Sequence, residues 1–366
     1  MCNFPIRGKS QQKSGQKSKW KFNRNNKPAE DDDDSTHLFS SPSKMRTTDL
    51  TEVYKVPSRH YQSAQDVITA KGFKLGYQIG KGNFGTVRRG VRVRDNLPVA
   101  CKQLKMRDTA LQAIISAKNE LYVMEAVNHP HIIKMYEHFI VDLVDLSIRY
   151  VFIFMQLAEG DSLSVYIRLV KRGLPELQCK QMMAQMVSAL NHMHAQGIAH
   201  RDLKMGNVLL DDHQNCLVSD FGLSRVAAKG ENMTSTKFCG TMAYMAPEVI
   251  LNSESSIEYN PFTADIWALG VILYAIVNHG YPFGARGSNI FEQQMKHRIK
   301  LSYKITFEPD QCLMDLLYRL LDPNVQRRIS ISDLMTHRWI APELRRIENA
   351  LQGTGDKLMN CGNFAL

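Results

Sequence analysis

One short segment of the chain carries the side chains that phosphoryl transfer requires. Residues 200–207 read HRDLKMGN, with a carboxylate at Asp202, a cation at Lys204 and an amide at Asn207. A carboxylate can orient an attacking hydroxyl and accept its proton, while a cation offsets the charge of the transferred group. Amide and carboxylate oxygens hold Mg²⁺, and a later Asp-Phe-Gly triplet offers a second such ligand, Asp220. The pattern therefore points to transfer of a phosphoryl group to a hydroxyl.

A glycine-rich segment lies upstream and suits phosphate binding. Residues 79–87 read IGKGNFGTV, and their glycines would let backbone N–H groups approach phosphate oxygens where a Cβ would intrude. A dinucleotide-binding fold would need a helix directly after the last glycine, but an alternating strand pattern follows here. The Gly-Lys-[Ser/Thr] sequence of a P-loop is absent. By itself this segment could also be a hairpin that happens to contain glycines. The residues that follow it in the sequence distinguish the two interpretations.

A lysine inside an apolar run supports the nucleotide interpretation. Lys102 ends the sequence VACK at 99–102. Burying such a charge is costly unless anions meet it, and nucleotide phosphates together with a carboxylate would do so. Glu120, on the following helical segment, is the candidate carboxylate.

The first third of the chain shows strand patterns, and the remainder shows mostly helical ones. Strands alternate apolar and polar residues or carry β-branched runs, whereas helices repeat apolar residues at spacings of three and four. The expected strands are 73–79, 86–93, 99–104 and 150–155, with a hairpin turn at Asp95-Asn96 and short strands near 208–210 and 217–219. The expected helices include 114–124, 177–194 and 266–277, with others up to Trp339. This order predicts an α+β fold with a β-rich N-lobe, an α-helical C-lobe and a cleft between them.

The composition is that of a globular chain in a reducing compartment. The 366 residues are 44% hydrophobic and 22% charged. Seven scattered cysteines without a Cys-x-x-Cys pair argue against a disulfide framework and a zinc site. No apolar run reaches the roughly 18–20 residues of a membrane span, and no secretory signal is visible. We expect a cytoplasmic location, with the nucleus as an alternative.

The ends of the chain differ from its centre. Residues 1–29 hold eight Lys and Arg without an acid, and 30–34 are all acidic. Such a segment could be a nuclear-import, nucleic-acid or membrane-surface patch, or simply a solvated leader; the lack of interleaved aromatics favours the leader. We expect a disordered basic tail that could bind acidic partners at 1–71, one domain at 72–340 (N-lobe 72–157, C-lobe 158–340) and a short C-terminal tail at 341–366.

From Phe73 to Trp339 the sequence resembles a eukaryotic protein kinase domain. The matching residues are Gly80, Gly82, Phe84, Gly85, Val87, Ala100, Lys102, Glu120, His200, Arg201, Asp202, Asn207, Asp220, Phe221, Gly222, Ala246, Pro247, Glu248, Asp265, Trp267, Gly270 and Arg328. Lys204 and Thr241 resemble Ser/Thr kinases. Within these, the chain is similar to the calmodulin-dependent kinase group and most of all to testis-specific serine kinases.

The resemblance implies roles for individual residues, with ATP and Mg²⁺ as cofactors. Asp202 and Lys204 would be catalytic, Lys102 and Glu120 would pair to position phosphates, and Asn207 with Asp220 would hold magnesium. Glu248 and Arg328 would form a structural ion pair. The implied ATP-contacting residues are Ile79, Gly80, Lys81, Gly82, Asn83, Phe84, Gly85, Thr86, Val87, Ala100, Lys102, Met155, Gln156, Ala158 and Leu209. Met155 would be the gatekeeper and 156–158 the hinge that bonds adenine.

The activation segment departs from the family pattern. Where many such kinases carry a phosphorylated Thr, this chain has Lys237. Arg201 and Arg225 would ordinarily form a basic pocket for that phosphate, and a lysine there adds like charge. The hydroxyls that could take the phosphate instead are Thr236 first, then Thr234 or Ser235. The alternative is that no phosphorylation is needed.

A second departure concerns substrate choice. Kinases that select arginine before the target residue place acids at three positions, which are Ser162, Gly206 and Ala275 here. We therefore expect weak selection for basic residues, although Asp161 lies close by. The substrates are expected to be proteins, with no specific nucleic acid and no membrane span. A catalytically silent pseudokinase scaffold is the alternative function, disfavoured because the lysine, base and metal ligands all remain.

Overall fold

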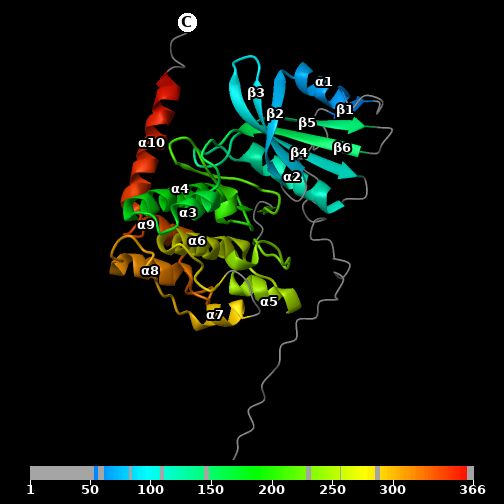
Figure 1. Ribbon diagram of the computed structural model, residues 1–366. Coiled ribbons are helices and arrows are strands. Elements are labelled where there is room, and N and C mark those ends of the chain that lie inside the picture. Colours follow the sequence, from blue (N-terminus) through cyan, green and yellow to red (C-terminus); the bar gives the residue numbers. More distant parts are fainter. Residues whose placement is uncertain are drawn as a thin grey trace, which may run out of the picture. The chain divides into compact units, whose positions relative to one another are not determined.

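The described part of the chain belongs to one of two compact units. The computed structural model describes residues 53–56, 62–81, 85–107, 111–143, 148–227, 232–255, 257–284 and 289–360. The units are Met1–Asp33 and Asp34–Leu366, and every described residue lies in the second. The second unit contains the expected β-rich and helical lobes (Figure 1). The predicted α+β fold is thus confirmed.

The N-lobe is built on a six-stranded sheet. Its strand order is β1-β5-β6-β4-β3-β2, and only the β1–β5 pair is parallel. The strands are β1 (Val53–Val56), β2 (Phe73–Lys81), β3 (Gly85–Arg92), β4 (Leu97–Arg107), β5 (Met135–Leu143) and β6 (Ile148–Gln156). The predicted turn between β3 and β4 is present, and Asn96 takes the left-handed conformation there with φ 54°.

Alternation along the strands divides the apolar side chains between two faces of the sheet. On β6, Phe152 and Phe154 join an aromatic cluster with Phe73 and Phe139, whereas Ile153 and its alternate neighbours belong to the main core. The rings of Phe73 and Phe154 stack with centroids 3.8 Å apart. The main core continues through α2 (Leu111–Ala126) into the C-lobe. Successive residues of one strand therefore hold together two different layers.

Two ordered elements precede the expected boundary between tail and domain at residue 72. Strand β1 and helix α1 (Gln62–Ala70) both lie before it, and Ile68 of α1 is only 2% exposed. Ala64, Val67 and Ile68 recur at helical spacing and pack against the aromatic face of the sheet. The charges of residues 1–34 dominate the composition of the first 71 residues and hide this short amphipathic pattern.

The C-lobe is helical around one apolar helix. Its helices are α3 (Leu163–Val170), α4 (Glu176–Ala195), α5 (Pro247–Ser255), α6 (Pro261–Asn278), α7 (Ile290–Lys296), α8 (Gln311–Leu320), α9 (Ile331–Thr336) and α10 (Ala341–Asn360). Helix α6 alone among the described helices is long and apolar enough to cross a membrane, and 83% of that stretch is buried inside the protein. It therefore serves as the core helix expected from the sequence.

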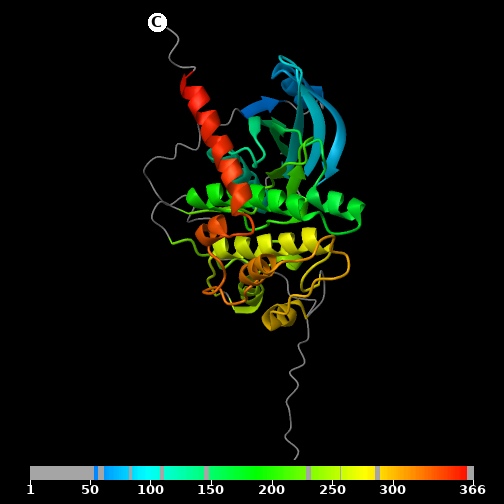
Figure 2. The ribbon, with the colours of Figure 1, turned by 90° about the vertical axis from the view of Figure 1, so that its left-hand side faces the viewer.

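Helix α10 occupies the region expected to be a short C-terminal tail. It packs against α4, with Leu344 only 1% exposed, and both views show it beside that helix (Figures 1 and 2). The segment from residue 341 is helical because apolar residues such as Leu344 and Ile347 continue at helical spacing beyond Ile340.

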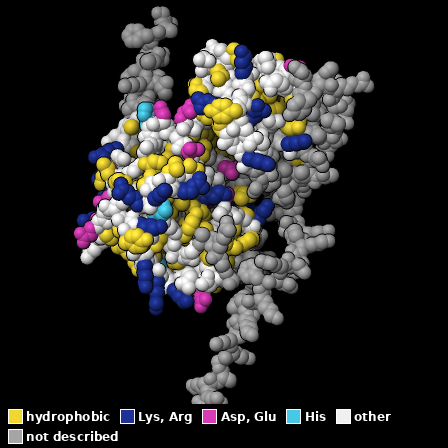
Figure 3. All heavy atoms as spheres, in the orientation of Figure 1, with side chains coloured by type: hydrophobic (Ala, Val, Ile, Leu, Met, Phe, Trp, Pro, Cys, Tyr) yellow, Lys and Arg dark blue, Asp and Glu magenta, His cyan; other side chains and the backbone are white. Residues whose placement is uncertain are grey.

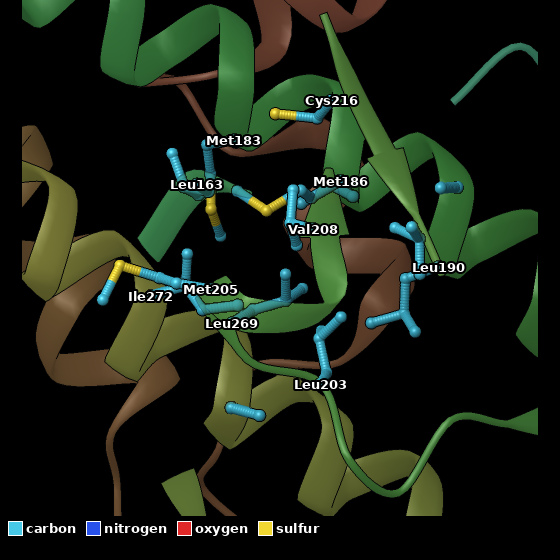
Figure 4. Packing of buried hydrophobic residues seen from close by; sticks show 14 of the residues in the cluster. Leu163, Met183, Met186, Leu190, Leu203, Met205, Val208, Cys216, Leu269 and Ile272 are labelled. Carbon is cyan, nitrogen blue, oxygen red and sulfur yellow. The ribbon is translucent and has the colours of Figure 1, made fainter. Parts of the chain in front are cut away.

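The segment with the chemically active residues lies between α4 and α6. Leu203 and Met205 are buried among Met183, Met186 and Leu269 (Figure 4). The segment continues into a short 3₁₀ helix (Met205–Asn207) and the hairpin of β8 (Val208–Leu210) and β9 (Cys216–Val218). Because alternate residues point into the core, the polar residues between them are left to face the cleft.

Candidate active site

Lys102 of β4 meets two carboxylates from different parts of the chain. Its Nζ lies 2.6 and 2.7 Å from the carboxylate oxygens of Glu120 on α2, and 3.0 Å from Oδ1 of Asp220, just after β9. Burial by itself would lower the pKa of Lys102, but the charges of Glu120 and Asp220 raise it above its ordinary value. The predicted pair is therefore present, with Lys102 held as a cation between the lobes.

The two carboxylates respond differently to this lysine. Burial raises the pKa of Glu120, which is 3% exposed, and the Lys102 charge opposes that effect. For Asp220, burial acts in the same direction, but the Lys102 charge outweighs it and lowers the pKa, with help from His200 and Lys204. Asp220 is consequently ready to bind a cation at neutral pH.

Asp202 sits in a network of three donors. Lys204 Nζ lies 2.5 Å from Asp202 Oδ2 and donates to Thr241 Oγ1 at 2.9 Å. Thr241 Oγ1 in turn donates to Asp202 Oδ1 at 2.8 Å. Asn207 Nδ2 donates to the backbone oxygen of Asp202 at 2.9 Å and to Oδ2 at 3.1 Å. The carboxylate of Asp202 is therefore fixed in orientation by a cation, a hydroxyl and an amide.

Asp265 of α6 holds the backbone of this catalytic loop. Its two carboxylate oxygens accept hydrogen bonds from the backbone N–H groups of His200 and Arg201, both at 2.8 Å. Arg201 has φ 66° and Asp220 has φ 67°, left-handed conformations that cost energy in non-glycine residues. The buried carboxylate of Asp265 offsets part of that cost at Arg201 and thereby fixes the start of the loop.

Asn207, an expected magnesium ligand, is joined by hydrogen bonds to Ser219, the residue before the other expected ligand, Asp220. The backbone oxygen of Asn207 accepts hydrogen bonds from both the N–H and the hydroxyl of Ser219, each at 2.9 Å. Because Asn207 uses its amide nitrogen toward Asp202, its side-chain oxygen is left for a cation. An amide and a carboxylate oxygen suit Mg²⁺, which keeps water and phosphate oxygens as its other ligands. Among the described residues no cluster of three or more His, Cys, Asp or Glu offers a metal site.

Strands from the N-lobe and the start of the C-lobe surround the expected nucleotide cleft. Gly80 and Lys81 of β2 pair with Val87 and Thr86 of β3, and Ile79 precedes them. Gly82, Asn83 and Phe84 lie outside the described residues. At Gly85, a Cβ would come 2.1 Å from the Gln103 backbone oxygen, so only glycine allows β3 and β4 to meet there.

Other residues expected to contact the nucleotide lie on β4, β6 and β8 and just after β6. Ala100 on β4 pairs with Met155 on β6, and both are buried. Gln156 ends β6, and Ala158 and Leu209 are half-buried against the core. An ion pair also links β3 to the hinge region, with Arg89 Nη1 2.6 Å from Glu159 Oε2.

The activation segment gives its candidate hydroxyls very different exposure. Ser235 is 2% exposed, and its backbone pairs with Tyr259. Thr236 is exposed and Thr234 half-buried. Arg201 donates from Nη2 to Cys239 Sγ at 3.0 Å. Thr236 is thus the most accessible of the three, and its phosphorylation stays a prediction.

Arg225 and the structural ion pair complete the set of predicted residues. Arg225 lies on β10 (Arg225–Val226), which pairs with β7 (Ile198–Ala199) just before Arg201. The Arg328 guanidinium meets the Glu248 carboxylate at 2.6 and 2.8 Å and lies over the Trp267 ring, 5.0 Å from its centroid. The ion pair expected from the resemblance is therefore present.

Two residues gain roles that sequence reasoning did not assign to the site. Thr241 bonds Asp202 although 39 residues separate them, and Asp265 bonds Arg201 across 64 residues. In the sequence, Thr241 directly after Cys239 and Gly240 indicates only that the acceptors are Ser or Thr hydroxyls. Asp265 is there only a residue that matches the kinase family. Neither observation predicts the hydrogen bonds to the catalytic loop, because these bonds depend on how distant segments fold together.

Comparison with known proteins agrees with this geometry. The family described as "Protein kinase domain" matches residues 73–340. Mouse testis-specific serine/threonine-protein kinase 2 is 34% identical over 283 residues, covering 75% of each chain. Mouse testis-specific serine/threonine-protein kinase 1 is 32% identical, covering 77% of this chain and 76% of the relative. Rice CBL-interacting protein kinase 26 is 33% identical, covering 78% of this chain and 56% of the relative. With its catalytic residues assembled across both lobes, the chain belongs to the protein kinase domain family and is a protein serine/threonine kinase.

Proposed function

We propose that the chain is catalytically active and transfers the γ-phosphate of ATP, with Mg²⁺, to Ser and Thr hydroxyls of protein substrates. The proposal depends mainly on one observation, which is that two hydrogen-bonded networks are present together. Lys102 bonds both Glu120 and Asp220, and Asp202 is bonded by both Lys204 and Thr241. Each network joins segments distant in sequence, which is what the reaction demands.

Each residue contributes a defined step. Asp202 orients the substrate hydroxyl and accepts its proton as the oxygen–phosphorus bond forms and the bond to the ADP oxygen breaks. Lys204 offsets the negative charge that develops on the transferred group. Lys102 holds the nucleotide phosphates, and Glu120 holds Lys102. Magnesium bound at Asn207 and Asp220 would neutralise phosphate charge.

The alternative is a pseudokinase that keeps the fold without turnover. Such a protein would gain nothing from positioning a base, a cation and two metal ligands, and all four are retained here at hydrogen-bonding distances. Cytoplasmic residence is proposed with this function, since the scattered free cysteines suit a reducing compartment.

Acceptor choice and metal dependence test the proposal. Purified chain is given γ-labelled ATP and three peptides that differ only in Ser, Thr or Tyr at the acceptor. Labelling of the Ser and Thr peptides that requires Mg²⁺ is expected. Equal labelling of the Tyr peptide would contradict the acceptor assignment, and absence of labelling from all three would favour the scaffold.

A further inference from the structure

Two segments of the C-lobe carry cations and no acidic residue. They are residues 162–175 and residues 293–307. The cations are Arg168, Lys171 and Arg172 in the first segment and Lys296, Arg298, Lys300 and Lys304 in the second. These two stretches hold three and four cations, and they form a common surface only if the fold brings them together.

The fold does bring them together, through backbone contacts. Gly173 N–H donates to the Lys304 oxygen at 2.9 Å. A Cβ on Gly173 would lie 1.9 Å from the Val277 oxygen, so only glycine permits this approach. Asn278, at the end of α6, accepts a hydrogen bond from the N–H of Ser302 at 2.5 Å. The end of α3, the end of α6 and the chain after α7 therefore meet at one junction.

The resulting surface has no counter-charges of its own. We call it the cationic surface and define it as Arg168, Lys171, Arg172, Lys300 and Lys304. Within the described part of the chain, ion pairs form at many other cations, but none involves these five. All but the half-buried Lys304 are exposed. Figure 3 shows Lys and Arg side chains gathered among hydrophobic ones on the face of the C-lobe toward the viewer.

Exposed apolar groups lie within the same surface. Leu169 is 68% exposed and Tyr303 is 92% exposed. Each has one cation as a chain neighbour, Arg168 beside Leu169 and Lys304 beside Tyr303. Like charges held close together repel one another unless anions neutralise them, and the apolar groups offer contact area for a bound chain. The surface thus fits an anionic ligand that also has apolar contacts.

We propose that the cationic surface docks an acidic segment of the protein substrates. The proposal rests on the proposed function, because it places the segment beside a working active site. Ser162, which caps α3, bridges to Leu209 at the nucleotide cleft. The eight residues of α3 span about 12 Å. A substrate held at the far end of α3 can therefore reach Asp202 with its acceptor hydroxyl.

A polypeptide fits better than a nucleic acid. Single-stranded nucleic acids bind on several aromatic side chains between cations, whereas Tyr303 is the one aromatic residue among the exposed residues of both acid-free segments. An acidic docking segment also agrees with the missing carboxylates at Ser162 and Gly206, since neither position offers an attraction for arginine.

Steady-state kinetics with paired substrates test the proposal. One Ser acceptor peptide is joined through a Gly-Ser linker to six Glu or to six Gln residues. The enzymes are the full-length chain, its Arg172→Glu/Lys300→Glu variant and an Arg338→Glu/Arg345→Glu control. Each variant replaces two exposed cations with Glu and thereby shifts the net charge by about four units, and none of the replaced residues forms an ion pair among the described residues. Thermal unfolding checks that both variants are folded.

The wild type and the control are expected to show a KM roughly tenfold lower for the Glu substrate, as for two or three exposed ion pairs, with kcat unchanged. The Arg172→Glu/Lys300→Glu variant loses this advantage but phosphorylates the Gln substrate as the wild type does. High salt abolishes the advantage in the wild type and in the control. An advantage that survives in this variant at low salt overturns the proposal.

Direct binding separates this proposal from the proposed function. A fluorescent six-Glu peptide is expected to bind wild type and control more tightly than the Arg172→Glu/Lys300→Glu variant, even if none of the enzymes transfers phosphate. Phosphatidylserine vesicles and single-stranded DNA serve as rival probes. Loss of vesicle or DNA binding in the variant, with peptide binding unchanged, contradicts an acidic polypeptide as the occupant.

Discussion

Lys102 keeps its positive charge inside the protein because two carboxylates surround it. The Glu120 contact fixes α2 to the sheet, and the Asp220 contact fixes the C-lobe to the same side chain. The second network uses fewer charges. There Thr241, a neutral residue, connects the base Asp202 to the cation Lys204. Single hydrogen bonds at this scale determine whether the base and the cation are aligned.

Replacement of Thr241 tests that connection. Thr241→Val keeps the shape of the side chain but removes the hydroxyl that bonds Lys204 and Asp202. We expect kcat to fall by roughly 10- to 100-fold, with the KM for ATP nearly unchanged, because positioning of the base is lost and nucleotide contacts are not. Thr241→Ser should restore most of the activity. Wild-type kcat in the valine variant would show that the hydroxyl has no catalytic part.

A group of histidines predicts how stability depends on pH. Burial lowers the pKa of His129 from 6.5 to about 4, and it also lowers the pKa of His131 and of His192. His129 contacts Ser188 of α4 at 3.0 Å, and its ring lies 5.7 and 5.2 Å from the other two rings. In the folded protein these rings stay neutral at pH values where the unfolded chain takes up protons.

The sign follows from that difference in proton uptake. Stability contributed by His129 is present above pH 6.5 and falls as the pH decreases from 6.5 toward about 4. Denaturant unfolding of wild type and His129→Asn, measured across this range, should show a shallower pH slope for the variant. Identical slopes for the two proteins would mean that His129 is protonated alike in both states.

At the scale of elements, the catalytic loop owes its shape to its two supporting helices. Helix α4 and helix α6 bury Leu203 and Met205 between them, and Asp265 of α6 bonds the backbone at both His200 and Arg201. Helix α1 supports the sheet in a similar way, because it covers the aromatic face with Ile68. The elements outside the expected domain are therefore structural parts of the N-lobe.

A core substitution in α1 tests whether the N-lobe depends on it. Ile68→Ala removes a buried side chain and should lower the free energy of unfolding by about 2–5 kcal/mol. The exposed Gln65→Ala on the same helix should change it by less than about 0.5 kcal/mol. Chemical denaturation of both variants gives the comparison. Equal, small effects would show that α1 does not contribute to the folded core.

Elements with strong periodicity could be predicted from the sequence, and contacts between distant elements could not. Strands β2, β3, β4 and β6 and helix α4 follow alternation or helical spacing closely. Helix α1 was missed because its three apolar residues lie in a polar, charged region. The bonds of Thr241 and Asp265 depend on three-dimensional approach, so residue spacing carries no record of them.

At the scale of the whole molecule, the site exists only where the two lobes meet. Lys102 from the sheet bonds Asp220 from the C-lobe, and Arg89 bonds Glu159 beside the hinge. The N-lobe contributes Lys102 and Glu120 and the C-lobe contributes Asp202, Lys204 and Asp220, so neither lobe alone holds all of the predicted catalytic residues. The C-lobe also carries the cationic surface, whose residues are separate in sequence from the catalytic carboxylates.

Substrate preference follows from the residues around the acceptor. Ser162 and Gly206 carry no charge, and Ala275 is 1% exposed inside α6, so no carboxylate at these positions can attract arginine. A positional peptide library should show weak selection for basic residues before the target Ser or Thr. Dominant arginine three residues before the target would contradict this account and would point to Asp161 as the attracting group.

The central claim is that Asp202 acts as the base in phosphoryl transfer. Its most direct test compares wild type with Asp202→Asn in transfer of labelled γ-phosphate to a Ser peptide, with ATP affinity measured for both proteins. We predict unchanged ATP binding and a transfer rate at least ~100-fold lower in Asp202→Asn, because only the base is lost. Equal transfer rates in the two proteins, whether fast or negligible, would contradict it.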